Sequence, residues 1–168
     1  MALTQQLARV SPQYLAWCRE AAAASPDGDP RWEPPESDTL DLDWAVWELL
    51  RLYRHAHPGA HEIAVLDRAI HGDADGRVGF LDHPTVHDGF DAPPAVLAPA
   101  AVREVARELS RVDIAPVLEA ALPAYREAGG FSGFAGDPRA CLVDHFTLLR
   151  RFYRAADERG MAVVVWAD

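Results

Sequence analysis

The clearest pattern of apolar residues lies towards the end of the printed chain. Over this stretch apolar side chains recur at spacings of 4, 3, 4 and 3, at Leu142, Phe146, Leu149, Tyr153 and Ala156. This period is typical of an α-helix that buries one face. Asp137 and Pro138 suit the cap and the first position of such a helix, and Gly160 suits its end. The pattern therefore predicts a long helix between Pro138 and Gly160.

Two segments predict β-strands. Met161–Trp166 is apolar at every position, which is typical of a strand buried on both faces. Leu3–Val10 alternates less regularly and predicts a second short strand. We expect these two strands and the last helix to pack together, so that both ends of the chain lie in one core.

Other segments have helical spacing or helix-capping residues. We expect one helix to start at Ser11-Pro12, with Tyr14, Leu15, Trp17 and Cys18 as its apolar stripe. Further helices are predicted over Leu40–His55, Glu62–His71, Pro99–Val112 and Ile114–Ala128. Pro123 falls inside the last of these and predicts a kink or a break. Val78–Leu81 predicts a further short strand.

Together these elements predict an α+β fold, with about five helices packed around a small sheet that includes the N-terminal and C-terminal strands. The chain has 168 residues, so we expect residues 1–168 to form a single domain. Residues 25–38 form a Pro-rich acidic stretch, which predicts a loop because prolines interrupt helices and central strands.

The charge of the chain is strongly negative, at −10, and it is unevenly distributed. Eight acids and one base, Arg31, lie between Glu20 and Asp43. Such a surface repels phosphate backbones, so we expect no nucleic-acid partner. It would suit a basic protein partner, although an acidic stretch that only keeps the protein soluble is the simpler interpretation.

Composition excludes several other functions. All 16 basic residues are arginine, which rules out a lysine Schiff base and the lysine of a P-loop. The two cysteines do not indicate a disulfide scaffold. The sequence MALTQQLARV lacks the features of a signal peptide, and no apolar run approaches the roughly 18 residues that span a bilayer. We therefore expect a soluble cytoplasmic protein that contacts no membrane.

Five segments occur in an order found in a known family: Leu7–Cys18 (LARVSPQYLAWC), Leu40–Leu52 (LDLDWAVWELLRL), Leu66–Gly72 (LDRAIHG), Leu97–Val112 (LAPAAVREVARELSRV) and Leu148–Asp168 (LLRRFYRAADERGMAVVVWAD). Together they resemble the YfbM-like family of bacterial proteins of unknown function, along nearly the whole chain. The resemblance implies an α+β fold and a bacterial source, and it brings no activity. Arg51 or Glu48 stands where many members have His, His71 replaces a usual Leu, and Gly129–Pro138 lacks an Ile-Tyr-Pro motif.

Aromatic residues are the strongest candidates for a binding surface. Trp44 and Trp47 share one turn of a predicted helix, and Phe90, Phe131 and Phe134 lie on predicted loops. Aromatic side chains on Gly-rich loops are harder to explain by core packing than those on helices. These residues could line a ligand cleft or an interaction patch, whereas core packing is the alternative for the two tryptophans.

Histidines and carboxylates gather in the segment 82–88. His83 and His87, with Asp82 and Asp88, have the composition of a metal site, although Pro84 argues against the continuous helix that would align them. Solvated or helix-capping histidines are the simpler interpretation, and we assign no metal ligand.

Two further groups on the last predicted helix could carry chemistry. Cys141 lies near its start, with His145 one turn later, which is the composition of a Cys–His nucleophile. A buried cysteine without catalytic function is the alternative. Arg150, Arg151 and Arg154 could bind a phosphate or a carboxylate, or could instead pair with the acidic stretch or face water.

Two hypotheses for function remain, and neither assigns catalytic residues or a cofactor. The first is a non-catalytic binding or regulatory protein, in one version an immunity-like protein, that recognises a partner protein through acidic and aromatic loop surfaces. The second is an enzyme or small-molecule binder whose site contains Trp47, Arg51, His83, His87 and Asp88, covered by loops 83–94 and 129–138.

Overall fold

A four-stranded antiparallel sheet lies at the centre of the computed structural model, which describes residues 4–87, 89 and 92–168. The strands are β1 (Gln5–Val10), β2 (Thr39–Asp41), β3 (Ala95–Leu97) and β4 (Ala162–Ala167), in the spatial order β2-β1-β4-β3. The helices are α1 (Pro12–Ala24), α2 (Ala45–Ala56), α3 (His61–His71), α4 (Pro99–Arg111), α5 (Ala115–Glu127) and α6 (Pro138–Glu158). The predicted α+β class is confirmed.

The two ends of the described chain lie side by side. Strand β1 pairs with β4 along its whole length, from Gln5 opposite Ala167 to Val10 opposite Ala162. Beyond them, the Thr4 N–H donates to the Asp168 carbonyl at 2.7 Å, and the Asp168 N–H donates back at 3.0 Å. The expected closure of both ends into one core is therefore confirmed.

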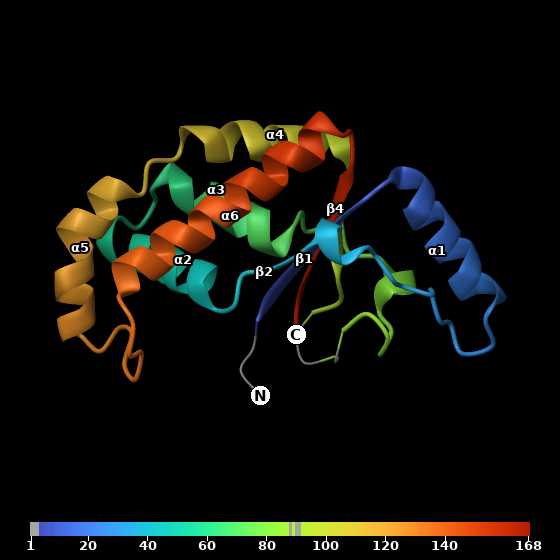
Figure 1. Ribbon diagram of the computed structural model, residues 1–168, viewed down its shortest axis with the longest axis horizontal. Helices are drawn as coiled ribbons and strands as arrows, with labels where there is room; N and C mark the ends of the chain where they lie inside the picture. The colour runs from blue at the N-terminus through green and yellow to red at the C-terminus, as the bar shows by residue number, and fades with distance from the viewer. Residues whose placement is uncertain (1–3, 88, 90–91) are drawn as a thin grey trace.

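Side chains from the sheet enter two cores, because successive residues of a strand point to opposite faces. On one face, Leu7, Val163 and Val165 pack against helices α2 to α6. On the other face, Ala8, Val10 and Val164 pack against α1 and the segments around Trp32 and Leu81. Figure 1 shows α1 at one end of the long axis and the α2–α5 pair at the other.

The predicted stripe of the last helix is confirmed: Leu142, Phe146, Leu149, Tyr153 and Ala156 are all buried. The Tyr153 hydroxyl donates to the Ala69 carbonyl at 2.7 Å, which joins α6 to α3. The Asp137 side chain accepts from the Arg139 N–H and caps the helix. Strand β4 is buried at five of its six positions, as its uniformly apolar sequence predicts.

The predicted helix over Leu40–His55 begins too early. Residues Thr39–Asp41 form strand β2 on β1, and the Leu42 N–H donates to the Gln5 carbonyl at 2.9 Å. Asp43 then takes a positive φ of 52°, and its N–H is held by the Asp41 carboxylate at 2.7 Å. Helix α2 starts only after this turn, so neither aspartate lies in its first turn.

Two other predictions are wrong in detail, and one alternative is excluded. Gly79–Leu81 is a 3₁₀ turn and not a strand, whereas the short strand β3 lies further on at Ala95–Leu97. Of the kink or break predicted at Pro123, the break is excluded, because α5 continues through this residue. Trp17 does not join Leu15 and Cys18 in the core, since it is 46% exposed.

The acidic loop 25–38 is anchored at its end by a partly buried ion pair. Asp38 accepts from Arg9 Nε at 2.7 Å and from Arg159 Nη1 and Nη2 at 2.5 and 3.2 Å. The hydrogen bonds from Arg159 and Arg9 hold the pKa of the Asp38 carboxyl below its ordinary value. Arg159 thus pairs with the acidic stretch. Arg150, Arg151 and Arg154 make no such pair among the described residues.

None of the described helices combines the length and the apolar character that crossing a membrane requires.

Candidate functional site

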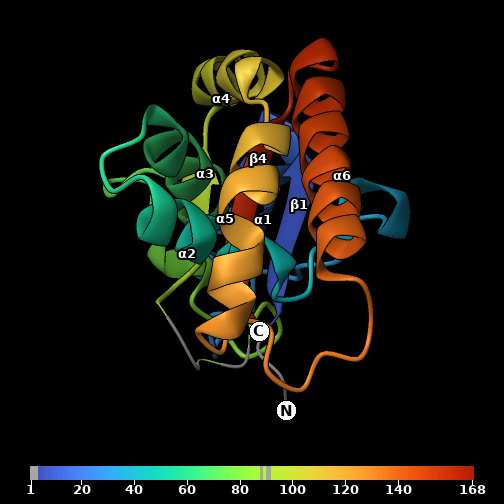
Figure 2. The same ribbon diagram turned by 90° about the vertical axis from the view of Figure 1, so that its left-hand side faces the viewer.

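An open cleft of about 660 Å³ lies where α2, the end of α5 and the loop after α5 meet. Figure 2 faces this end of the molecule and shows α5 between α2 and α6. The side chains that define the cleft come from all three segments: Trp44, Glu48, Arg51, Tyr125, Phe131 and Phe134. We call it the aromatic cleft.

Helical spacing explains why residues of α2 form one side of the aromatic cleft. Trp44, Glu48 and Arg51 are separated by four and three residues, so they share one face of α2. The opposite face, which includes Leu49 and Leu52, is buried in the core and fixes the rotation of the helix.

The loop after α5 forms the other side of the cleft, and it does so through unusual backbone conformations. Phe131 has a φ of 61°, which is uncommon for a residue with a side chain and costs energy. Gly130 allows the chain to pass the Tyr125 ring, because a Cβ at this position would lie 2.3 Å from two of its atoms. The loop therefore holds its two phenylalanines against α2 and α5, where packing compensates for the strain.

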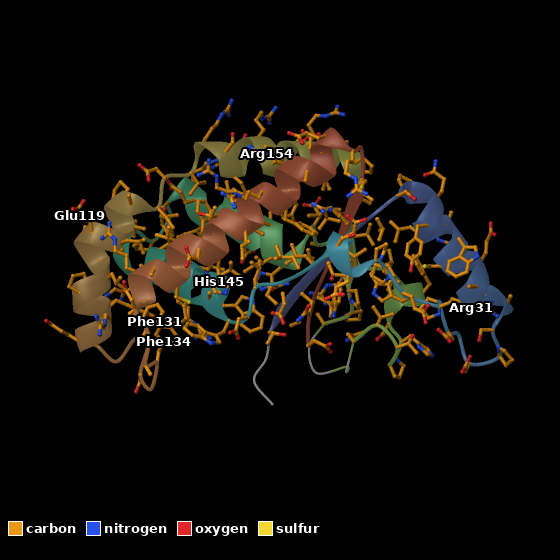
Figure 3. All side chains as sticks on the ribbon, in the orientation of Figure 1. Arg31, Glu119, Phe131, Phe134, His145 and Arg154 are labelled. Atoms are coloured by element: carbon orange, nitrogen blue, oxygen red, sulfur yellow. The ribbon has the colours of Figure 1, made fainter. Side chains whose placement is uncertain are left out.

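The aromatic rings contact one another in a continuous chain. The Trp44 ring centroid lies 5.8 Å from that of Phe131 and 5.2 Å from that of Phe134, in edge-to-face arrangements. Phe131 also packs edge-to-face on Tyr125, with 6.0 Å between centroids. Figure 3 shows Phe131 and Phe134 next to each other on this loop. Such edge-to-face pairs are energetically favourable and stabilise the arrangement of the rings that line the cleft.

One corner of the cleft is polar. The Tyr125 hydroxyl donates to Glu48 Oε2 at 2.9 Å, and Arg51 Nη1 pairs with Glu48 Oε1. Burial and the neighbouring Glu48 carboxylate raise the pKa of Tyr125 to about 12, so its hydroxyl stays protonated at neutral pH. Arg51 is largely exposed and keeps donors free for an incoming acceptor.

The residues that line the cleft are mainly aromatic or small, with few nucleophilic groups. Among the described residues that line it, Ser132 is the single hydroxyl nucleophile besides tyrosine, and no histidine lines the cleft beside it. The arrangement supplies apolar walls and one hydrogen-bonding corner, which is the make-up of a recognition site.

The structure separates the residues of the second hypothesis. Trp47 lies in the core layer and not in the cleft, where its Nε1–H donates to Gln5 Oε1 at 2.9 Å. His83 and His87 lie on the opposite side of the sheet near α1, on the segment coloured green in Figure 1. The composite site of Trp47, Arg51, His83 and His87 is therefore not assembled. Asp88 and Phe90 lie outside the described residues.

Both histidines of that segment have local partners. His83 Nδ1 lies 2.9 Å from the Thr85 hydroxyl, and the buried His87 has Nε2 at 3.1 Å from Asp82 Oδ1. Within residues 4–87, 89 and 92–168 no three histidine, cysteine or acidic side chains converge in a way that could hold a metal ion.

The Cys141–His145 pair is close but poorly arranged for catalysis. His145 Nδ1 lies 3.7 Å from the Cys141 sulfur and only 2.8 Å from the Cys141 carbonyl oxygen. Burial raises the pKa of the Cys141 thiol, and the nearby carboxylates of Asp43 and Asp144 add to this rise.

Cys141 should therefore be alkylated slowly by iodoacetamide near neutral pH in the folded protein. Mass spectrometry can follow the reaction in buffer and in urea. We expect both cysteines to react faster in urea, because unfolding returns their thiols to an ordinary pKa. Faster alkylation of Cys141 in the folded protein would contradict this assignment.

A second groove, of about 350 Å³, lies at the other end of the molecule between α1 and the acidic loop. Tyr14, Trp17 and Trp32 form its aromatic wall, with Tyr14 centroids 5.9 and 5.7 Å from those of Trp17 and Trp32. Asp29, Arg31 and Glu33 line the same groove, and Figure 3 shows Arg31 far from Phe131 and Phe134. We call it the acidic groove.

Part of the aromatic cleft is predictable from the sequence: the structure brings together Trp44, Arg51, Phe131 and Phe134, which are among the candidate residues. Glu48 and Tyr125 are not among those candidates, although the spacing of Trp44, Glu48 and Arg51 indicates a shared helix face. The acidic groove is not predicted either, because the spacing of Trp17 places it in the apolar stripe of its helix.

Comparison of the chain with protein-family models, with curated proteins and with solved structures gave no match.

Proposed function

We propose that this chain is a non-catalytic cytoplasmic binding or regulatory protein that recognises a partner protein through the aromatic cleft. The observation that carries the proposal is the ring of Trp44, Tyr125, Phe131 and Phe134 around an open cleft that has no nucleophile–base pair among its described residues. Interfaces concentrate their binding energy in aromatic side chains and arginine, which are the residues found here.

The strained loop supports this proposal. Phe131 has a positive φ, which persists only where surrounding contacts stabilise it. Such backbone strain concentrates at functional sites. Pre-formed aromatic walls lose little conformational entropy on binding, so a partner side chain that enters the cleft gains affinity. The Glu48–Arg51 corner offers both an acceptor and donors that would orient that side chain.

Charge indicates the chemistry of the partner. The chain carries −10, and Glu33 in the acidic groove makes no side-chain ion pair among the described residues. Aromatic faces next to carboxylates attract arginine and lysine side chains through cation–π and Coulomb interactions. We therefore propose a basic partner, and one version of the function is an immunity-like protein that blocks a basic toxin.

Membership of the YfbM-like family belongs to the same proposal. Its support is the order of elements, in which a short strand leads into the Ser11-capped helix α1 and a long helix leads into the last strand. The family resemblance adds a bacterial source for such a regulator.

Phe134→Ala should strongly weaken partner binding at the cleft. The test is a pull-down from a bacterial lysate with wild-type, Phe134→Ala and Leu148→Ala baits. Leu148 is the matched control, because it is an exposed apolar residue of α6 outside the cleft. For a purified partner we expect about 30-fold weaker binding by Phe134→Ala, since a central aromatic contact contributes about 2 kcal/mol.

The salt dependence tests the electrostatic part separately. Raising the NaCl concentration from about 0.05 M to about 0.5 M shortens the Debye length and should weaken binding of a basic partner. Equal recovery by wild-type and Phe134→Ala baits would contradict the role of the cleft. If salt does not change how much partner is recovered, the partner is not basic, but the role of the cleft is not contradicted.

A small molecule is the second candidate occupant, and the volume of the cleft favours it. About 660 Å³ lies within the usual range for small-molecule sites. A thermal-shift screen against metabolites distinguishes the two candidates. A compound that stabilises wild type by several degrees, and fails to stabilise Phe134→Ala, would replace the partner-protein proposal.

A further inference from the structure

A third groove, of about 300 Å³, lies between α4 and α6 on the outer side of the helical layer. Arg154, which lines it, is labelled in Figure 3 and lies well away from Phe131 and Phe134. The lining consists of two α4 residues and four α6 residues: Ala106, Ser110, Thr147, Arg150, Arg151 and Arg154. We call it the arginine groove, and it is separate from the aromatic cleft.

Helical spacing explains how the arginines converge. Thr147, Arg150, Arg151 and Arg154 follow one another at i, i+3, i+4 and i+7, so they share one face of α6. The facing residues of α4, Ala106 and Ser110, are small and leave the space open.

The hydroxyls of the groove are already engaged as donors. Thr147 Oγ1 donates to the Val143 carbonyl at 2.7 Å, and Ser110 Oγ donates to the Arg107 carbonyl at 2.6 Å. Guanidinium groups are therefore the main free donors of the groove. Any ligand that they bind must supply acceptors.

The groove contains three positive charges and no acid, in a chain that has 26 acids and 16 arginines. Three acids elsewhere on α4 and α6 are engaged with other bases, whereas Glu158 of α6 lies 3.7 Å from Arg154. Glu104 pairs with Arg68 at 2.9 Å, Asp157 pairs with Arg103 at 3.4 Å, and Glu108 contacts His61 at 3.1 Å. Apart from the exposed Glu158 beside Arg154, the positive charge of the groove is thus not neutralised by the acids of α4 and α6 that pair with other bases.

The three arginines differ in what holds them. Arg150 lies over the Phe146 ring, 5.7 Å from its centroid, which orients the guanidinium and leaves its edge free to donate. Arg154 is 3.7 Å from Glu158, but both side chains are highly exposed, so this pair is weak. Across the part of the chain that the structure describes, Arg151 makes no ion pair.

We propose that the arginine groove binds the phosphate group of a small metabolite. The guanidinium group of arginine binds phosphate oxygen atoms through two parallel hydrogen bonds. Two or three such groups can replace the hydrogen bonds that a phosphate dianion makes with water. The volume admits a phosphate with a small organic group. The overall charge of −10 opposes a long nucleic-acid backbone, which selects a small anion as the ligand.

The test uses inorganic phosphate and glycerol 3-phosphate as probes, with sodium chloride at matched ionic strength as the reference. Binding is followed by the NMR shifts of the arginine side-chain Nε–H groups. We expect saturable binding with a millimolar dissociation constant, and a loss of about tenfold in each of Arg151→Gln and Arg154→Gln. These surface substitutions leave the core intact, so the variants should unfold at the wild-type temperature.

Arg126→Gln is the matched control, because Arg126 is an exposed arginine of α5 that does not line the groove. It should bind phosphate as wild type does. The proposal is overturned if no saturation occurs up to about 50 mM, if chloride produces the same shifts, or if Arg126→Gln loses as much affinity as Arg151→Gln. Tighter binding of glycerol 3-phosphate than of inorganic phosphate would identify an organic phosphate as the ligand, and the reverse order would identify the free ion.

Discussion

Replacing Leu149 with alanine should lower the free energy of unfolding by about 3 to 4 kcal/mol. Leu149 lies in the middle of α6, is completely buried, and belongs to the core that the helices share with the sheet. Truncation would remove its buried methyl groups and leave a cavity that closely packed neighbours cannot fill. Urea unfolding followed by circular dichroism would measure the change.

The neighbouring residue provides the control. Leu148 has the same side chain and the same helix propensity but is 41% exposed, so Leu148→Ala should cost less than about 1 kcal/mol. Similar losses in the two variants would mean that α6 is rotated from the orientation described, and would also undermine the face on which the arginine groove lies.

The second large effect is expected at Asp38. Asp38→Asn should lower the free energy of unfolding by about 2 kcal/mol at pH 7, because the charged hydrogen bonds to Arg9 and Arg159 are weakened and the partly buried Arg9 guanidinium loses its counter-charge. The effect is smaller than for a fully buried pair, since solvent screens the Arg159 side chain, which is 48% exposed. Glu36→Gln in the same 3₁₀ turn is the control and should have little effect.

The same pair predicts how stability depends on pH. The pKa of Asp38 is lower in the folded protein than its ordinary value of 3.8, which approximates the unfolded state. Its contribution is therefore complete above about pH 4 and is lost as the pH falls through the folded-state pKa. The stability difference between wild type and Asp38→Asn should shrink between pH 7 and about pH 3. A difference that stays constant over this range would contradict the ion-pair assignment.

The sequence allowed the strongest elements to be predicted. The helical period at Leu142, Phe146 and Leu149 and the apolar run of β4 are local patterns, and each determines its own element with little help from the rest of the chain. The prediction that the N-terminal and C-terminal strands belong to one small sheet is confirmed by the pairing of β1 with β4.

Other features depend on contacts that no local pattern contains. Leu40 belongs to a strand because β1 offers it hydrogen bonds, and the apolar spacing of Leu40–His55 is also compatible with a helix. The same holds for β3, whose three residues pair with β4. Trp17 has helical spacing with Leu15 but lies at the edge of the second core, where it remains exposed.

The candidate sites show the same division. Aromatic residues on a Gly-rich loop indicated a binding surface, and Phe131 and Phe134 do line the aromatic cleft. The contribution of Tyr125 results from the way α5 packs on α2, which the sequence does not reveal. The arginines of α6 were recognised as a group, but the small residues of α4 that open a groove beside them were not.

The pairing of β1 with β4 also has a consequence for synthesis on the ribosome. Gln5 and Trp166 are hydrogen-bonded although they are 161 residues apart, so β1 leaves the exit tunnel long before its main neighbour exists. Until then β1 can pair only with the three residues of β2, and its other edge stays open to strands of other chains. Assembly of the sheet must therefore follow translation of β4, and such non-local pairing favours slow folding. We expect nascent chains that lack β4 to depend on chaperones.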